Sequence, residues 1–167
     1  MTRGGVSAPR GDLTREQFAE AACEAAQAVF SMMVSMDLEP GEPYQDLNPP
    51  PFDGVVALLA FDGDWVGSGM VCCQERFACQ VSSGMLGHPR DAVDSEVLDG
   101  IGEVANMVLG NVKEILESRT GSLSLSVPTV LWGKNFCARS GIRAPWWVQP
   151  FHNGEERFEV RVCLKRR

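Results

Sequence analysis

The strongest structural signal in the sequence lies in residues 94–121, which read DSEVLDGIGEVANMVLGNVKEILESRTG. Apolar residues recur there at spacings of three and four, the period of an α-helix with one buried face. Asp94 is a suitable N-cap and Gly121 a suitable C-terminal stop, so we predict a helix over about residues 94–118. Its buried face is predicted to consist of Ile101, Ala105, Val108, Val112 and Ile115.

The opposite face of this helix carries Glu103, Asn106, Gly110 and Lys113, spaced by three, four and three residues. Residues at these spacings are neighbours on a helix surface, so Glu103 and Asn106 are expected to form an adjacent pair that faces solvent. By itself, a glutamate three residues before an asparagine is typical of many solvated helices.

Three glycines lie inside the same helix, and each costs about 1 kcal/mol relative to alanine. Either the helix packs closely against a sheet, or another protein approaches its backbone. Gly110 lies on the face of Glu103 and Asn106, which favours a partner protein there. For Gly100 and Gly102 both explanations remain open.

A second long helix is predicted over about residues 13–36, with Thr14 as N-cap and Gln17 completing a capping box. Residues 37–53 contain five prolines and are interpreted as an ordered crossing loop without regular structure. A short helix is expected over residues 75–86.

The strand signals come mainly in antiparallel pairs, one around the turn at residues 62–64 and one around Asn153-Gly154. Two long helices separated by such hairpins predict an α+β fold, in which two long helices pack on a mainly antiparallel β-sheet in two layers. We expect one domain over residues 13–167 after a flexible tail of residues 1–12. The predicted strands are Gly54–Phe61, Trp65–Gln74, Ser122–Val127, Pro145–Phe151 and Arg157–Leu164.

The composition excludes several classes of protein. With 15 basic and 22 acidic residues among 167, the net charge is −7, which argues against a nucleic-acid partner. No apolar run approaches twenty residues and residues 1–10 lack a signal-peptide core, so we expect a cytoplasmic protein with no membrane partner. The six cysteines include no Cys-x-x-Cys pair, which argues against a zinc site or a disulfide framework.

Residues 99–111, DGIGEVANMVLGN, resemble the signature helix of the CheX/CheC/FliY family of chemotaxis phosphatases. In that family a Glu-x-x-Asn pair follows an Asp-x-φ-Gly lead-in, where φ is an apolar residue, and precedes Gly-Asn. The resemblance extends to the hairpin that begins FDGD at residue 61 and to SVPTVLWG at residues 126–133, and it covers most of residues 14–165. Because the chain has one signature helix and not two, it resembles the CheX-like branch of the family.

The resemblance implies a phosphatase for the aspartyl phosphate of a CheY-type response regulator. Glu103 would bind the active-site lysine of the receiver domain, and Asn106 would orient the attacking water. An acyl phosphate is already reactive, so placing a water in line with phosphorus is the main requirement. A neutral carboxamide can donate to and accept from that water without repelling phosphoryl oxygens. We expect no cofactor in this protein, and Mg²⁺ only in the partner receiver.

Two other assignments follow from the sequence. On the first helix, Glu24 and Gln27 have the same spacing, but we interpret them as helix formers on a polar face and leave them out of the catalytic set. Trp146 and Trp147 are neighbours in a predicted strand, so their rings should point to opposite sides of the sheet and one should face outward. Because CheX-like proteins are commonly dimers, we expect a homodimer with these tryptophans at its interface.

The alternative to a phosphatase is a module with the same fold that docks a receiver or oligomerises without catalysis. A structural subunit similar to the flagellar-switch relatives is a weaker alternative, because no second domain is fused to the predicted one. Intact Glu103 and Asn106 favour the enzyme, since docking alone does not need the carboxamide.

Overall fold

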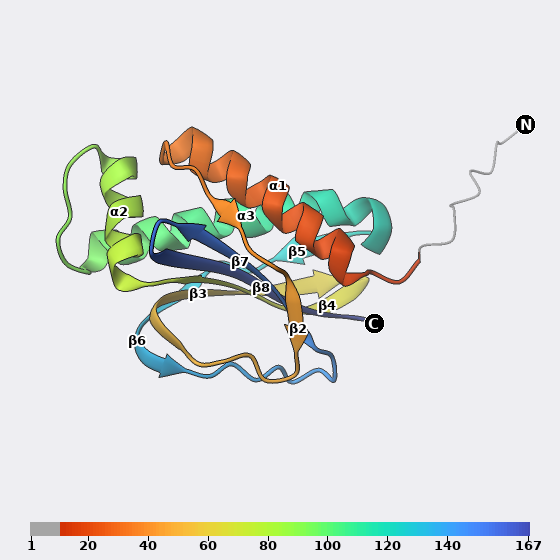
Figure 1. The fold of residues 1–167 in the computed structure, drawn as a ribbon. Coiled ribbons are helices and arrows are strands. Elements are labelled where there is room, and N and C mark those ends of the chain that lie inside the picture. Colours follow the sequence, from red (N-terminus) through yellow and green to blue (C-terminus); the bar gives the residue numbers. More distant parts are fainter. Residues whose placement is uncertain (1–10) are drawn as a thin grey trace, which may run out of the picture.

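The computed structural model describes residues 11–167 (Figure 1). Within this range, three helices lie on one face of an eight-stranded antiparallel sheet. The predicted α+β class, with two long helices on an antiparallel sheet, is confirmed. The helices are α1 (Arg15–Met33), α2 (Glu75–Leu86) and α3 (Ser95–Thr120).

The sheet has the order β1-β7-β8-β4-β3-β5, with β2 also pairing with β7 and β6 also pairing with β3. Both predicted hairpins are present as β3–β4 and β7–β8. The strands are β1 (Glu39–Pro40), β2 (Tyr44–Asp46), β3 (Phe52–Gly63), β4 (Trp65–Cys73), β5 (Leu123–Leu125), β6 (Thr129–Phe136), β7 (Trp146–Asn153) and β8 (Glu156–Arg166).

The ends of both long helices are set by the residues that the sequence singles out. The hydroxyl of Thr14 accepts a hydrogen bond from the Gln17 N–H at 3.2 Å, and the Gln17 side chain accepts one from the Thr14 N–H at 3.1 Å, so the capping box is confirmed. Helix α1 ends at Met33, about three residues earlier than predicted, and Ser35 beyond it has a φ of 55°. At the start of α3, Asp94 Oδ1 accepts from the Val97 N–H at 2.9 Å.

The prediction that residues 37–53 lack regular structure is wrong, because β1 and β2 form there and pair with β7. Proline removes one ladder donor but is tolerated in an edge strand, and β1 and β2 lie at the edge of the sheet. Two smaller differences concern later segments. The two-residue turn before β8 consists of Gly154 and Glu155. The strand predicted over residues 122–127 is shortened to β5, and the strand β6 that follows it was not among the predicted strands.

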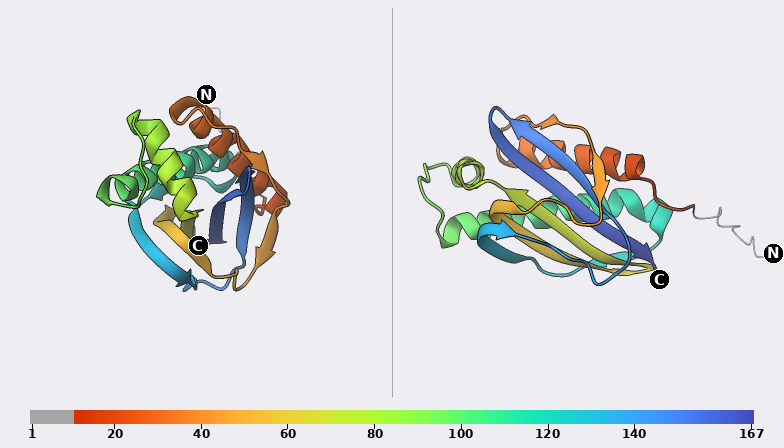
Figure 2. Two further views of the ribbon diagram at one scale, coloured as in Figure 1. Left: turned by 60° about the vertical axis from the view of Figure 1, so that its left-hand side comes forward. Right: turned by 60° about the horizontal axis from the view of Figure 1, so that its bottom comes forward.

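The sheet has a buried cluster on each face. The larger lies between the sheet and the three helices, and there Phe158 of β8 contacts the rings of Phe30 and Phe77, with centroids 4.8 and 5.8 Å away. On the other face, the chain leading into β3 and the chain following β6 pass beneath the strands (Figures 1 and 2). That smaller cluster contains Phe52, Val56, Met70, Cys72, Trp146, Val148 and Cys163.

The two tryptophans of β7 do point to opposite sides of the sheet, but the prediction that one faces outward is wrong. Trp146 is only 2% exposed in the smaller cluster, and Trp147 stacks on Phe18 of α1 with ring centroids 6.0 Å apart. Strand β7 is not an edge strand, since β8 flanks it on one side and β1 and β2 on the other. The structure therefore removes the reason for placing a dimer interface at these rings, which was an outward-facing tryptophan on an edge strand.

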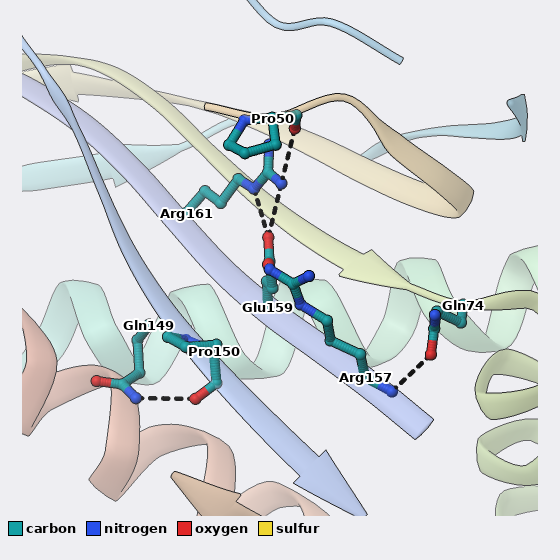
Figure 3. Close-up of polar contacts among 7 residues, drawn as sticks. All are labelled: Pro50, Gln74, Gln149, Pro150, Arg157, Glu159 and Arg161. Atoms are coloured by element: carbon teal, nitrogen blue, oxygen red, sulfur yellow. Dashed lines mark hydrogen bonds and ion pairs between the residues drawn. The ribbon is translucent and has the colours of Figure 1, made fainter. Parts of the chain in front are cut away.

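A buried ion pair lies on the face of the sheet away from the helices (Figure 3). Arg161 Nε donates to the fully buried Glu159 at 2.7 Å, and another nitrogen of the same guanidinium donates to the Pro50 carbonyl at 3.2 Å. On the helix side of the sheet, Gln149 Nε2 donates to the Gly41 carbonyl at 2.9 Å. These contacts fix the proline-rich segment to the sheet.

The structure leaves the predicted N-terminal tail and the predicted domain bounds untested, and it bears on membrane-spanning segments only through its helices. The expected tail lies almost entirely in residues 1–10, which are outside the described residues, and the single domain over residues 13–167 stays a prediction. Among the helices of residues 11–167, none has the length and apolar character needed to cross a membrane.

Candidate functional site

Helix α3 buries its apolar face and presents the predicted pair to solvent. Glu103 and Asn106 are both exposed, as the helical spacing predicts. The only predicted core residue that stays partly accessible is Ile115, near the C-terminal end. The fully buried side chains on the opposite face include Ile101, Ala105, Val108 and Val112.

Glu103 and Asn106 lie in a shallow pocket of about 380 Å³. One wall is the exposed face of α3, and the other is the connection from β5 to β6 with the start of β6. The pocket therefore joins a helix face to chain more than twenty residues further along the sequence. Its lining residues are Asp99, Gly102, Glu103, Asn106, Val127, Pro128 and Val130.

Both polar side chains of the pair are available for contacts with another molecule. Among residues 11–167, neither the Glu103 carboxylate nor the Asn106 carboxamide has a hydrogen-bond or ion-pair partner. An unpaired carboxylate needs a cation or N–H donors, and an unpaired carboxamide offers one acceptor oxygen and two donor hydrogens. The pair can therefore bind a cationic group and a water molecule side by side.

The pocket is acidic. Asp99 and Glu103 contribute two carboxylates, and no lysine or arginine is among its lining residues. The lysine on the same helical stripe, Lys113, instead forms an ion pair with Glu117 at 3.2 Å. The pKa of Glu117 is lowered because the Leu123 N–H donates to its carboxylate and because Lys113 lies beside it. A free anion entering the pocket would meet two carboxylates and no balancing cation among its lining residues.

The structure separates the roles of the three helix glycines. A Cβ on Gly102 would lie 3.2 Å from Val130 Cγ2, and one on Gly100 would lie 3.6 Å from the Ser82 hydroxyl, so both positions pack against neighbouring elements. A Cβ on Gly110 would have no atom within 4 Å. Close internal packing explains Gly102, but a Cβ on Gly100 would make only ordinary van der Waals contact and one on Gly110 none, which leaves open backbone on the face of Asn106.

The similar pair on α1 has different surroundings. Glu24 and Gln27 are exposed, but the Gln27 amide donates to the Leu38 carbonyl at 3.4 Å. Neither residue lines the pocket on α3. This arrangement agrees with the interpretation that they are helix formers on a polar face.

Sequence reasoning missed part of the pocket. Asp99 lies one helical turn before Glu103, so the spacing of four residues could have identified it. Val127 and Pro128 belong to a different segment, and no local pattern indicates that they meet α3. Within residues 11–167, no group of three or more His, Cys, Asp or Glu side chains is arranged to hold a metal ion, and all six cysteines are free thiols.

Several solved structures with the same fold are described as chemotaxis proteins. The CheX protein of Desulfovibrio desulfuricans is 26% identical, with a TM-score of 0.81 over 89% of this chain and 99% of that chain. The CheX protein of Vibrio vulnificus is 25% identical, with the same TM-score and the same shares of both chains. A CheX–CheY–BeF3–Mg²⁺ complex from Borrelia burgdorferi has a TM-score of 0.73 at 22% identity, over 89% of this chain and 97% of that chain.

The sequence comparisons agree with the fold. No curated protein sequence matches the chain. The model of the family described as chemotaxis phosphatase CheX matches residues 55–152, more than half of the chain and a range that includes all of α3. The chain therefore belongs to the CheX family of chemotaxis phosphatases.

Proposed function

We propose that this protein hydrolyses the aspartyl phosphate of a CheY-type response regulator, with Glu103 binding the receiver domain and Asn106 orienting the attacking water. One observation carries the proposal. An exposed carboxamide without a partner among residues 11–167 lies one helical turn from an equally unpaired carboxylate, in a pocket of a CheX-family protein.

The chemistry requires little of the enzyme beyond positioning. Asn106 accepts a hydrogen bond from the water and holds its oxygen in line with phosphorus. The bond from the water oxygen to phosphorus forms as the bond from phosphorus to the aspartyl oxygen breaks. The aspartate leaves as a carboxylate, and both protons of the water stay with the inorganic phosphate, which is released as H2PO4−. Because the carboxamide is neutral, it approaches the phosphoryl oxygens without repulsion.

The charge of the pocket favours a protein-bound phosphoryl group over a small phosphate ester. Asp99 and Glu103 would repel a free anion, whereas a receiver brings a lysine and Mg²⁺ with its phosphoryl group. Glu103 can then form an ion pair with that lysine and fix the position of α3. The CheX of the Borrelia burgdorferi complex is bound to CheY with BeF3 and Mg²⁺, which supports the same class of partner here.

The proposal extends to the compartment, the cofactor requirement and the oligomeric state of the protein. We place the protein in the cytoplasm, because its six free thiols suit a reducing compartment. It needs no cofactor of its own, and the Mg²⁺ belongs to the receiver. A homodimer stays a prediction, with an interface that does not include Trp146 or Trp147. Light scattering during gel filtration tests the dimer, and a monomer at micromolar concentration would contradict it.

The decisive assay measures inorganic phosphate released from purified CheY-type receivers of the source organism after phosphorylation with acetyl phosphate. We expect the protein to accelerate release from at least one receiver and to leave a small ester such as p-nitrophenyl phosphate intact. If every receiver loses phosphate at its unassisted rate while binding is detectable, the non-catalytic docking module becomes the better account. Hydrolysis of the small ester would contradict the argument from pocket charge.

A further inference from the structure

An exposed apolar residue stands on the rim of the pocket. Val127 is 83% exposed, and its apolar side chain would lower the free energy of the complex if a partner removed it from water. It lies in the three-residue connection between β5 and β6, and it lines the same pocket as Glu103 and Asn106. A molecule that fills the pocket around Asn106 therefore contacts Val127 as well.

The backbone around Val127 is held firmly on both sides. Before it, the Ser126 N–H donates to the Ala60 carbonyl at 2.9 Å, and the Ser126 hydroxyl accepts from the Ala60 N–H at 2.8 Å. After it, Pro128 has a fixed φ. The valine is therefore presented on rigid chain attached to β3, and binding a partner would cost little ordering of this segment.

The connection is also fixed relative to α3. A Cβ on Gly102 would lie 3.2 Å from Val130 Cγ2 and 3.7 Å from Pro128 Cγ, so this part of the chain packs directly on the helix backbone next to Glu103. Val127 and Pro128, together called the apolar shelf, thus lie at a fixed position beside the polar pair.

We propose that the apolar shelf binds an apolar side chain beside the phosphorylated aspartate of the receiver and thereby selects which receivers are dephosphorylated. This inference rests on the proposed function. The phosphoryl group, its Mg²⁺ and the lysine define the whole substrate class, so they cannot distinguish one receiver from another. A rigid apolar contact next to them can, because specificity is a difference between the affinities for competing partners.

Charge favours a receiver over a second copy of this chain as the occupant. A symmetric contact would place the same patch of both copies face to face. Asp99 and Glu103 of one copy would then meet the same two carboxylates of the other. A receiver offers a lysine and Mg²⁺ to these carboxylates instead, while the apolar shelf covers its neighbouring side chain.

The test is the dependence of phosphate release on receiver concentration for Val127→Ser, which removes the apolar contact without adding charge. We expect KM to rise about fivefold to tenfold, with a much smaller change in kcat. Val127→Ile should retain the KM of the unmodified protein. The matched control is Leu47→Ser, because Leu47 is 68% exposed on the chain between β2 and β3 and does not line the pocket.

Asn106→Ala, measured in parallel, separates this inference from the proposed function. If Asn106→Ala abolishes the acceleration and Val127→Ser leaves KM within twofold, the apolar shelf does not contact the receiver and the inference is overturned alone. An equal rise of KM in Val127→Ser and Leu47→Ser overturns it as well. If the unmodified protein accelerates release from no receiver, both proposals fall together.

Discussion

The two long helices lie side by side and carry the same pattern, a glutamate followed three residues later by a carboxamide residue (Figure 1). On α1, the carboxamide of Gln27 is engaged by the Leu38 carbonyl at 3.4 Å. On α3, Asn106 has no partner within residues 11–167 and shares a pocket with Glu103. Spacing places two side chains on one face, but their surroundings decide whether they are available to a substrate.

The largest expected effect is a difference in catalysed rate between variants of the carboxamide residues Asn106 and Gln27. We expect Asn106→Ala to lower the catalysed rate of receiver dephosphorylation at least about 100-fold, because the only other polar side chains that line the pocket are the carboxylates of Asp99 and Glu103, which repel phosphoryl oxygens. Gln27→Ala, the matched change on α1, should alter the rate less than about twofold. Single-turnover decay of a phosphorylated receiver measures both, and similar losses in the two variants would show that the helices do not differ in this way.

The second largest expected effect is a difference in KM between variants of Glu103 on α3 and Glu24 on α1. Glu103→Ala removes the proposed partner of the receiver lysine and should raise KM about tenfold to thirtyfold, with a weaker dependence on salt than in the unmodified protein. Glu24→Ala on α1 should leave both KM and its salt dependence unchanged. A measurement of KM at low and at physiological ionic strength distinguishes these results. Equal salt dependence in all three proteins would exclude an ion pair at Glu103.

A third expected effect concerns the open backbone of α3. Gly110→Ala should raise the free energy of unfolding by about 1 kcal/mol, since the new methyl group meets no atom within 4 Å and alanine favours the helix. If a receiver approaches this backbone, the same variant should bind it severalfold more weakly. Denaturant unfolding and receiver titration measure the two quantities.

Gly84→Ala on α2 provides the matched control for this prediction. There the new Cβ would lie 2.9 Å from Val34 Cγ1 and 3.0 Å from the Val34 carbonyl oxygen, so we expect a loss of stability instead. A stabilised Gly110→Ala protein with unchanged receiver affinity would show that no partner comes close to Gly110.

The smallest expected effect concerns how the C-terminal ends of α1 and α3 contribute to stability at different pH. Helix α3 is tied to β5 by the Glu117 carboxylate, which accepts from the Leu123 N–H at 3.2 Å, whereas the end of α1 at Met33 is closed by backbone hydrogen bonds from Val34 and Met36 to the Phe30 carbonyl. The folded state lowers the pKa of Glu117, so its contribution to stability is present above its ordinary pKa of 4.5 and is lost as the pH falls through the lowered value.

Because water screens this partly exposed group, Glu117→Gln should cost only about 0.5 kcal/mol at pH 7, and the difference from the unmodified protein should vanish in acid. Urea unfolding at pH 7 and at pH 3 tests this. A difference that grows in acid would contradict the sign of the pKa shift.

Local patterns in the sequence were sufficient to predict the parts of the fold that depend on neighbouring residues. The capping box of Thr14 and Gln17 and the periodicity of α3 act within a few residues, and both are present in the structure. The strands in residues 37–53 were missed because their stability comes from pairing with β7, about a hundred residues away. Trp146 was misjudged for the same reason, since distant segments cover it.

In the candidate site too, the residues placed by local helix geometry were predictable and those placed by packing between distant segments were not. Glu103 and Asn106 were predictable because one helical turn determines their adjacency. The apolar shelf was not, because its position beside α3 depends on the packing of Pro128 and the nearby Val130 against Gly102, which no local pattern indicates. Likewise, only the structure distinguishes Gly102, which is packed, from Gly110, which is open.

The most direct test of the proposed catalytic role of Asn106 measures binding and turnover on the same variant. Binding is followed with a receiver loaded with fluoroberyllate and Mg²⁺, and turnover with the same receiver carrying phosphate. We predict that Asn106→Ala binds the loaded receiver with a Kd within about threefold of the unmodified protein but no longer accelerates phosphate release. Acceleration by Asn106→Ala equal to that of the unmodified protein would contradict a role of this carboxamide in orienting the water.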